Sequence, residues 1–190
     1  MSPACRARLR LLRPFGAPPI LLLLACGSPS RPGPALEAPA PDLGGVVLRS
    51  GTGGEVGRVS LRQAGDRVVV RVRVNGLPSG LHGMHLHEIG RCQPPGFQSA
   101  GPHWNPGGRR SHGQENPRGP HPGDLGNLSV GEDGRGERTA EITGLEASAG
   151  IRAVLGGLGR ALVIHANPDD ERTDPAGNTG PRLACAAITP

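Results

Sequence analysis

The chain contains seven histidines, and their placement constrains the fold more than any other feature of the sequence. They are His82, His85, His87, His103, His112, His121 and His165, and Asp124 follows the sixth by three residues. Neutral imidazole is the commonest protein ligand of zinc and copper, and a carboxylate can complete a zinc ligand set. Because all seven can be placed at one metal centre, the sequence predicts a fold that brings residues 82–165 together.

The spacing of these residues predicts the elements that carry them. His85 and His87 are two apart in GLHGMHLHEIG, and residues i and i+2 of a strand point to the same face. His165 ends the apolar run ALVIH, which predicts a second strand. The other candidates lie in a stretch rich in Gly and Pro that predicts a long loop: His103, His112, His121 and Asp124. Two strands and one loop supply the ligands, unlike a zinc finger with its CxxC pairs.

Periodicity along the chain predicts an all-β domain. Residues 66–74 alternate strictly, with four valines on one face and arginines on the other, as in a half-buried antiparallel strand. Further strands are expected at 45–50, 55–63, 82–88, 126–130, 137–145, 161–166 and 182–188, and 151–159 is read as a short strand and turn. Eight short strands with Gly-rich turns favour a sandwich or flattened barrel. The connections 89–125 and 167–181 are long, and long loops in compact domains are usually functional.

The N-terminal segment predicts export. Four arginines, at positions 6, 8, 10 and 13, precede an apolar stretch at 20–25, which is the plan of a secretory signal peptide. The following LLAC-G resembles a bacterial lipobox, so we expect residues 1–25 to be a signal peptide and Cys26 to be lipidated. Plain secretion is the alternative. Residues 26–41 then form a Pro-rich tether, and the folded domain spans 42–190.

Processing also explains the charge and the cysteines. Loss of the four arginines lowers the formal net charge from +5 to +1, which removes the reason to expect nucleic acid as a partner or a basic surface-binding module. After removal of Cys5 and lipidation of Cys26, Cys92 and Cys185 remain as an even pair in an oxidising compartment. Two free buried thiols are the alternative.

Five motifs in order carry a resemblance to a known family. GLHGMHLHEIG, SAGPHWNP, HPGDLGN, LVIH and GPRLAC together resemble copper–zinc superoxide dismutase of the bacterial type, over about residues 45–188. The resemblance implies an eight-stranded Greek-key sandwich or flattened barrel with a long metal-binding loop and a second channel loop. It also implies one copper and one zinc per subunit.

The resemblance assigns a role to each candidate residue. It gives copper the ligands His85, His87, His103 and His165, and it gives zinc the ligands His103, His112, His121 and Asp124. His103 is then shared by both metals and carries a proton to the second superoxide. Asp169 is the expected carboxylate behind one histidine of each set, with Asp170 as an adjacent competitor, and Arg182 attracts and orients superoxide. Cys92 and Cys185 form the intrasubunit disulfide, Gly83 and Gly101 allow close backbone approach, and His82 is structural.

The implied function is conversion of superoxide to oxygen and hydrogen peroxide by an enzyme exported to the bacterial cell envelope or periplasm. The expected partners are superoxide and, through the lipid on Cys26, a membrane. Bacterial members occur as monomers and as dimers, so a homodimer is one expectation. The competing hypothesis is a non-catalytic exported copper- or zinc-binding protein on the same fold. The short acidic loop 167–181, with Ala176 where some members have Thr, leaves the turnover rate open.

Overall fold

The computed structural model describes residues 42–142 and 150–190, all within one compact unit, Glu37–Pro190. The predicted signal peptide, Cys26 and the tether 26–41 lie outside the described residues. The end of the predicted strand 137–145 does so as well. Within the described part of the chain, no helix is long and apolar enough to cross a membrane.

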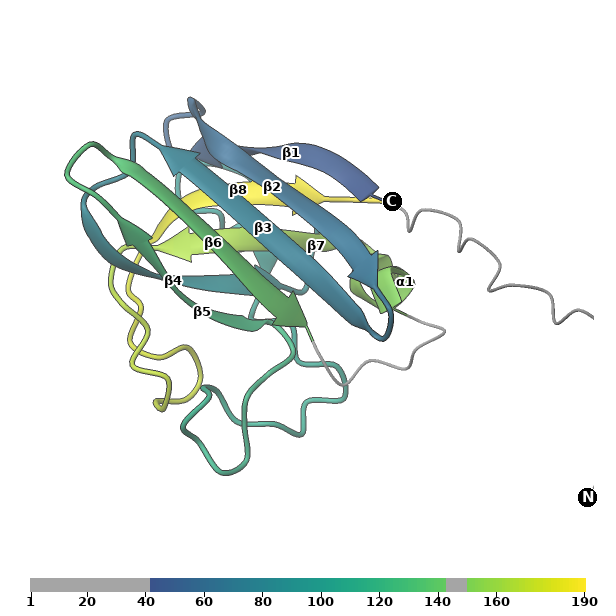
Figure 1. Ribbon diagram of the computed structural model, residues 1–190. Helices are drawn as coiled ribbons and strands as arrows, with labels where there is room; N and C mark the ends of the chain where they lie inside the picture. The colour runs from purple at the N-terminus through teal and green to yellow at the C-terminus, as the bar shows by residue number, and fades with distance from the viewer. Residues whose placement is uncertain (1–41, 143–149) are drawn as a thin grey trace, which may run out of the picture. The chain divides into compact units, whose positions relative to one another are not determined.

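The predicted all-β fold is confirmed (Figure 1). Eight antiparallel strands form a closed barrel in the order β1-β2-β3-β6-β5-β4-β7-β8. Their bounds are β1 Asp42–Ser50, β2 Glu55–Ala64, β3 Arg67–Asn75, β4 Gly80–His87, β5 Asp124–Val130, β6 Arg135–Ile142, β7 Arg160–His165 and β8 Arg182–Ile188. A 3₁₀ turn, η1, spans Gln98–Ala100, and a helix, α1, spans Gly150–Leu155.

The barrel is flattened because two of its seams are short. Strands β5 and β6 pair only at Val130 and Gly136, and β1 pairs with β8 only at its last two residues. The remaining pairings divide the strands into two groups of four. We call β1, β2, β3 and β6 the ligand-free sheet, and β4, β5, β7 and β8 the ligand sheet. In Figure 1 the ligand-free sheet lies in front of the ligand sheet.

The ligand-free sheet buries one face, as its alternation predicts. Val68, Val70 and Val72 of β3 are fully buried, whereas the intervening Arg71 and Arg73 are exposed. Both arginines bind Glu137 on the neighbouring strand β6. The valines pack with leucines and isoleucines of both sheets in the main core.

The ligand sheet is buried on both faces. Residues 82–87 of β4 are all buried, and Met84 and Leu86 belong to the main core. His85 and His87 therefore face the opposite side, as their spacing predicts. On β7 and β8, Val163 and Cys185 pack on that side against Phe97 of the long loop in a separate small cluster. The two long connections, 88–123 and 166–181, thus replace solvent over this sheet.

The prediction of a short strand and turn at 151–159 is wrong, because helix α1 spans Gly150–Leu155. Ile151 and Val154 are three apart, lie on one side of the helix and are buried against the core. A single turn of helix is too short for periodicity to distinguish it from a strand. Arg160 donates hydrogen bonds to carbonyls at the end of this helix, and this contact has no local signal in the sequence.

Candidate metal centre

Four histidines meet on the outer face of the ligand sheet. His85 and His87 project from β4, and His165 ends the adjacent strand β7. His103 reaches them from the long loop, where its backbone pairs with that of His87. One ring nitrogen from each of the four lies within 4.8 Å of the others, and all four residues are buried. The closest recorded pair is His87 Nε2 and His165 Nε2, 3.4 Å apart.

A second group surrounds Asp124 at the start of β5. The Nδ1 atoms of His103, His112 and His121 lie 3.2, 3.1 and 3.2 Å from the same oxygen, Asp124 Oδ1. The backbone N–H groups of Gly113 and His121 donate to the other oxygen, Oδ2. Loop and strand therefore hold this carboxylate in one orientation, with Oδ1 directed at three imidazoles.

These distances also fit a zinc ligand set. Atoms about 2.0–2.1 Å from a tetrahedral zinc lie about 3.3 Å from one another, which is close to the three separations around Asp124 Oδ1. The contact from His112 Nδ1 is short but does not have the alignment of a hydrogen bond. Neutral imidazole and carboxylate are also the donors that zinc binds. The geometry and the chemistry of the donors thus both fit zinc.

One difference from the predicted zinc set concerns His121. The second group of ligand atoms that all lie within 4.8 Å of one another consists of His85, His103, His112 and Asp124, with His85 in place of His121. His85 is close because its ring centroid lies 4.0 Å from that of His103. His121 lies next to Asp124, but its ring centroid is 5.9 Å from that of His103.

The ring nitrogens divide into an inner set and an outer set. Among the described residues, no hydrogen-bond partner is present for His85 Nδ1, His103 Nε2 or His112 Nδ1, all of which are buried. The outer nitrogens of other rings donate to backbone carbonyls: His87 Nδ1 to Gly101, His165 Nδ1 to Gly180, and His121 Nε2 to Arg110, at 2.8, 3.3 and 3.1 Å. Such outer bonds fix the tautomer and ring direction of metal-binding histidines. Buried nitrogens without partners are costly, so the inner set fits a site built for copper and zinc.

Asp169 joins the two groups. Its Oδ2 lies 2.6 Å from His85 Nε2, and its Oδ1 lies 2.9 Å from His112 Nε2. The carboxylate is thus placed behind one histidine of each predicted set. Asp170, the adjacent competitor, is exposed and accepts hydrogen bonds from Thr173 and Asn178 within its own loop.

Burial and charge shift the pKa values of the two groups in different ways. Burial lowers the pKa of His87 to about 2, of His165 to about 3 and of His103 to about 4, so these rings stay neutral and can donate to a metal. Burial also opposes the charge on His112, but Asp124 and Asp169 outweigh it and raise its pKa to about 10. A centre with two buried carboxylates therefore favours a positive charge within it.

His82 lies beside the centre but belongs to neither group. Its Nδ1 is 2.9 Å from the carbonyl oxygen of His165, and its Nε2 is 2.9 Å from that of Pro78. The ring is buried and ties the turn before β4 to the end of β7. This is the structural position expected for it from the sequence.

Two glycines allow the channel loop to approach the histidines. A Cβ on Gly83 would lie 2.4 Å from Thr179 Cγ2, so a side chain on β4 would displace the loop. Gly177 has a φ of +62°, and a Cβ there would lie 1.9 Å from Asp169 Oδ1. Gly83 was expected from the sequence, whereas Gly177 lies in a loop without a periodic signal. Gly101, the other glycine expected to allow close approach, has a φ of +74°.

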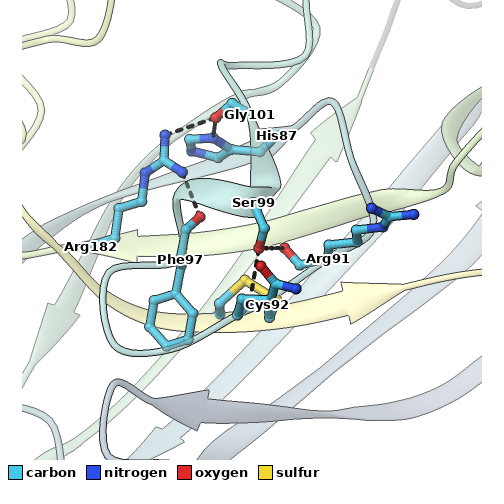
Figure 2. The surroundings of a disulfide bond; sticks show 9 residues. His87, Arg91, Cys92, Phe97, Ser99, Gly101 and Arg182 are labelled. Carbon is cyan, nitrogen blue, oxygen red and sulfur yellow. Dashed lines mark hydrogen bonds between the residues drawn. A yellow bond between two sulfur atoms is a disulfide. The ribbon is translucent and has the colours of Figure 1, made fainter.

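The disulfide links the long loop to the last strand and supports Arg182 (Figure 2). Cys92 and Cys185 are bonded, and Phe97 packs in the same cluster. Arg182 donates from Nη1 to the Phe97 carbonyl and from Nη2 to the Gly101 carbonyl, both at 2.7 Å. Because Gly101 also accepts from His87, one carbonyl orients a copper-ligand candidate and the predicted substrate-orienting residue.

A cavity of about 480 Å³ lies over this arrangement. Arg182 lines it together with three of the predicted copper ligands, His87, His103 and His165. The channel loop forms the opposite wall, including Ala176 and the buried Thr179. A small anion entering the cavity would meet a guanidinium beside neutral ring nitrogens.

Arg160 was not found from the sequence. Its guanidinium lies over the ring of Trp104, 4.9 Å from the centroid, and donates to the Glu88 carbonyl at 3.2 Å. These contacts hold the residues that directly follow His87 and His103. An arginine at the start of a strand resembles an ordinary surface residue, so no local pattern would have revealed this role.

Comparison with known proteins agrees with the geometry. Residues 55–188 match the family profile described as copper/zinc superoxide dismutase. A superoxide dismutase [Cu-Zn] of Caulobacter vibrioides is 38% identical over 147 residues, covering 75% of this chain and 83% of its own. A crystal structure of an SOD-like protein from Bacillus subtilis is 35% identical with a TM-score of 0.69, covering 76% of this chain and 97% of that one. Cu/Zn superoxide dismutase from Brucella abortus is 28% identical with a TM-score of 0.63, covering 78% and 99%. With the inner ring nitrogens and the barrel, these matches lead to one conclusion: the chain belongs to the copper/zinc superoxide dismutase family.

Proposed function

We propose that this protein converts two superoxide anions and two protons into one molecule of oxygen and one of hydrogen peroxide. The observation that carries the proposal is that Arg182 lines one cavity with His87, His103 and His165, and that the buried Nε2 of His103 has no hydrogen-bond partner among the described residues. Family membership and the relatives named superoxide dismutase support the same reaction.

Each metal is assigned to the group of mutually close ligand atoms that would hold it. Copper is held by His85, His87, His103 and His165, and zinc by His103, His112, His121 and Asp124. We place His121 rather than His85 on zinc because the Nδ1 atoms of His103, His112 and His121 converge on Asp124 Oδ1. Copper supplies the one-electron redox chemistry when bound, whereas zinc has none and orders the loop.

His103 is the residue suited to handle a proton. Its Nδ1 faces Asp124, and its buried Nε2 has no partner among the described residues. The ring belongs to both groups, so its Nδ1 would hold zinc and its Nε2 would hold copper. While Nε2 is free of metal it could hold a proton, and because His103 lines the cavity this proton could pass to a reduced oxygen species.

Arg182 is the residue suited to attract and orient the substrate. Its two carbonyl contacts hold the guanidinium at the cavity wall beside His87 and His165. A fixed positive charge in a cleft raises the local concentration of a small anion and its rate of association.

The alternative of a non-catalytic metal-binding protein is not favoured. Loss of copper ligands would be the usual route to such a protein, but the four predicted copper ligands form one group of mutually close atoms, and Arg182 lines a cavity with three of them. The decisive experiment measures copper and zinc content together with superoxide consumption on the purified protein. One copper and one zinc per chain without consumption would establish the alternative.

The ligand assignment is tested by Asp124→Ala. We expect this variant to lose zinc, to keep copper and to have a looser metal-binding loop, because Asp124 belongs only to the zinc set. Asp133→Ala, on an exposed turn, is the matched control and should retain both metals. Loss of copper with zinc fully retained in Asp124→Ala would contradict the assignment.

We also propose that the protein is exported and lipid-anchored. The disulfide fits an oxidising compartment, and the relatives of Caulobacter vibrioides and Aquifex aeolicus are bacterial. The proposal further assigns residues 1–25 to a signal peptide, Cys26 to lipid attachment and residues 26–41 to a tether, from the sequence alone. Labelled fatty acid should enter the wild type and not Cys26→Ser, and equal labelling of both would refute the anchor.

A further inference from the structure

We propose that zinc reaches its ligands through a cavity of its own, lined by Glu88 and Asn105, and not through the cavity that contains Arg182. This inference rests on the zinc ligand set proposed above. A buried metal site requires an access route, and the side chains along that route determine how fast a cation arrives.

Two cavities reach the shared ligand His103. The cavity of about 480 Å³ contacts His103 together with the copper-only ligands His87 and His165. A cavity of about 230 Å³ contacts His103 together with the zinc-only ligand His121. Pro102 and Pro175 line both cavities. Each cavity therefore leads to the exclusive ligands of one metal only.

Residual exposure of the zinc ligands agrees with this route. The side chains of His103 and His121 remain 5% and 7% exposed, whereas those of His112 and Asp124 are fully buried. A cation arriving from solvent would thus meet His103 and His121 first. Both residues line the 230 Å³ cavity.

The side chains that line the two cavities differ in charge, and the smaller cavity is the more acidic. The 480 Å³ cavity contains the guanidinium of Arg182, with Asp174 as its acidic residue. The 230 Å³ cavity contains an acidic residue, Glu88, and no arginine. Among the described residues, no ion pair is formed by the Glu88 carboxylate, but the Arg160 guanidinium, which donates to the Glu88 carbonyl at 3.2 Å, offsets part of its charge. The second cavity therefore attracts a divalent cation more strongly.

Asn105 lines the same cavity. Its Nδ2 donates to the Arg110 carbonyl at 2.9 Å, which fixes the amide plane. Its Oδ1 is buried and has no hydrogen-bond partner among the described residues, so this oxygen does not face solvent. A carboxylate at this position would add a negative charge beside the route.

A third opening provides the matched control. A cavity of about 140 Å³ contacts His121 and Asp124, and Glu141 and Arg110 line it. Glu141 already pairs with Arg67 at 2.9 Å, so its charge is partly neutralised. Glu88→Gln and Glu141→Gln thus remove the same charge from two different openings to the zinc ligands.

The experiment follows zinc uptake by the full-length mature protein from which zinc has been removed and copper retained. Zinc is added at low ionic strength, a chromophoric chelator reports free zinc, and the second-order rate constant is measured by stopped flow. We expect Glu88→Gln to slow uptake by about threefold to tenfold, as for loss of one charge close to the path of a divalent ion. Asn105→Asp should accelerate uptake by a similar factor, and Glu141→Gln should leave the rate unchanged.

The outcomes separate the route from the ligand set. If Glu141→Gln slows zinc uptake and Glu88→Gln does not, the proposed route is wrong. An uptake rate that does not depend on zinc concentration would also overturn the route, because opening of the loop would then limit uptake. Raising the salt concentration should reduce the difference between wild type and Glu88→Gln, because screening weakens the attraction. If the wild type binds no stoichiometric zinc, the ligand set fails, and if all variants take up zinc equally fast, only the route fails.

Discussion

The two sheets of the barrel are stabilised in different ways, although they share one core. The ligand-free sheet has a buried face of valines and a solvent face of arginine and glutamate pairs. The ligand sheet has the same core face, but loops cover its other face and histidines line it. Its outer layer contains polar groups that apolar packing alone does not satisfy.

Hydrophobic burial therefore stabilises the ligand-free sheet, whereas the ligand sheet also depends on polar and covalent contacts. Burial of β3 needs only the alternation of its residues. Burial of β4 over residues 82–87 also encloses histidines, which Asp169 hydrogen-bonds and metals would bind, beneath a loop that the disulfide ties down. We therefore expect changes of pH, redox state and metal content to act first on the ligand sheet and its loops.

Acid should have the largest effect, and it should act on the metal-free protein. Below about pH 6.5 the unfolded chain binds protons on His87, His103 and His165, whereas the folded chain, with pKa values of about 2, 4 and 3, does not. The contribution of these three neutral rings to the stability of the folded state is present above pH 6.5 and is lost as pH falls. His112, with a pKa of about 10, contributes fully below pH 6.5 and loses its contribution only as pH rises towards 10.

Urea unfolding of the metal-free protein between pH 7 and pH 4 measures this loss. We expect the free energy of unfolding to fall by several kcal/mol, since one pKa unit is worth about 1.4 kcal/mol. The metal-loaded protein, whose ring nitrogens are coordinated, should change less over the same range. A flat profile for the metal-free protein would show that these rings are not buried as neutral groups.

Removal of the disulfide should have the next largest effect. Cys92 and Cys185 are 93 residues apart, so the double variant with serine at both positions should lose about 4–5 kcal/mol by the chain-entropy estimate. Chemical denaturation measures the total, and hydrogen exchange locates it. We expect the backbone amides of residues 88–101 to exchange faster. The exchange rates of the β3 amides should rise only as much as the loss of global stability requires. Faster exchange of β3 beyond that proportion would remove the distinction between the sheets.

Arg182→Ala should leave both sheets intact and reduce the rate of superoxide consumption by roughly tenfold. Arg182→Glu should reduce it further, because the local potential changes sign while the copper ligands remain. The wild-type rate should fall with added salt, and this dependence should weaken in the alanine variant. A metal-replete Arg182→Glu enzyme with the wild-type rate and salt dependence would exclude a role for this arginine.

The smallest effect is expected on the solvent face of the ligand-free sheet. Glu137 accepts from Arg71 and Arg73, but all three side chains are substantially exposed. Because water screens such pairs, Glu137→Gln should leave the unfolding midpoint and the metal content unchanged within error. A clear drop in the midpoint would mean that this face also depends on specific polar contacts.

The sequence predicted residues with a strong local signature. The alternation in 66–74 located β3, and the spacing of His85 and His87 placed both on one face of β4. Ligand candidates in the loop could be predicted because histidine is rare and chemically specific. The predicted disulfide depended on the small number of cysteines and on the family resemblance.

Residues that act through backbone contacts escaped prediction. The carbonyl groups of Gly101 and Gly180 orient His87 and His165, but a carbonyl has no identity in a sequence. Arg160 and Gly177 act on neighbours that are distant in the chain, so no local period reveals them. Helix α1 was missed because six residues offer too few turns for a helical pattern.

The disulfide has a topological consequence for the unfolded chain. The covalent ring closed by Cys92 and Cys185 includes all four proposed zinc ligands, whereas His85 and His87, half of the copper set, lie outside it. In the oxidised but unfolded protein, the disulfide shortens the chain path between His87 and His165 from 78 residues to about 25, so it raises the effective concentration of the copper ligands. The zinc ligands lie within 21 residues of one another and gain less from it. Residual copper affinity of the oxidised unfolded chain then reduces the stabilisation that copper gives to the folded one.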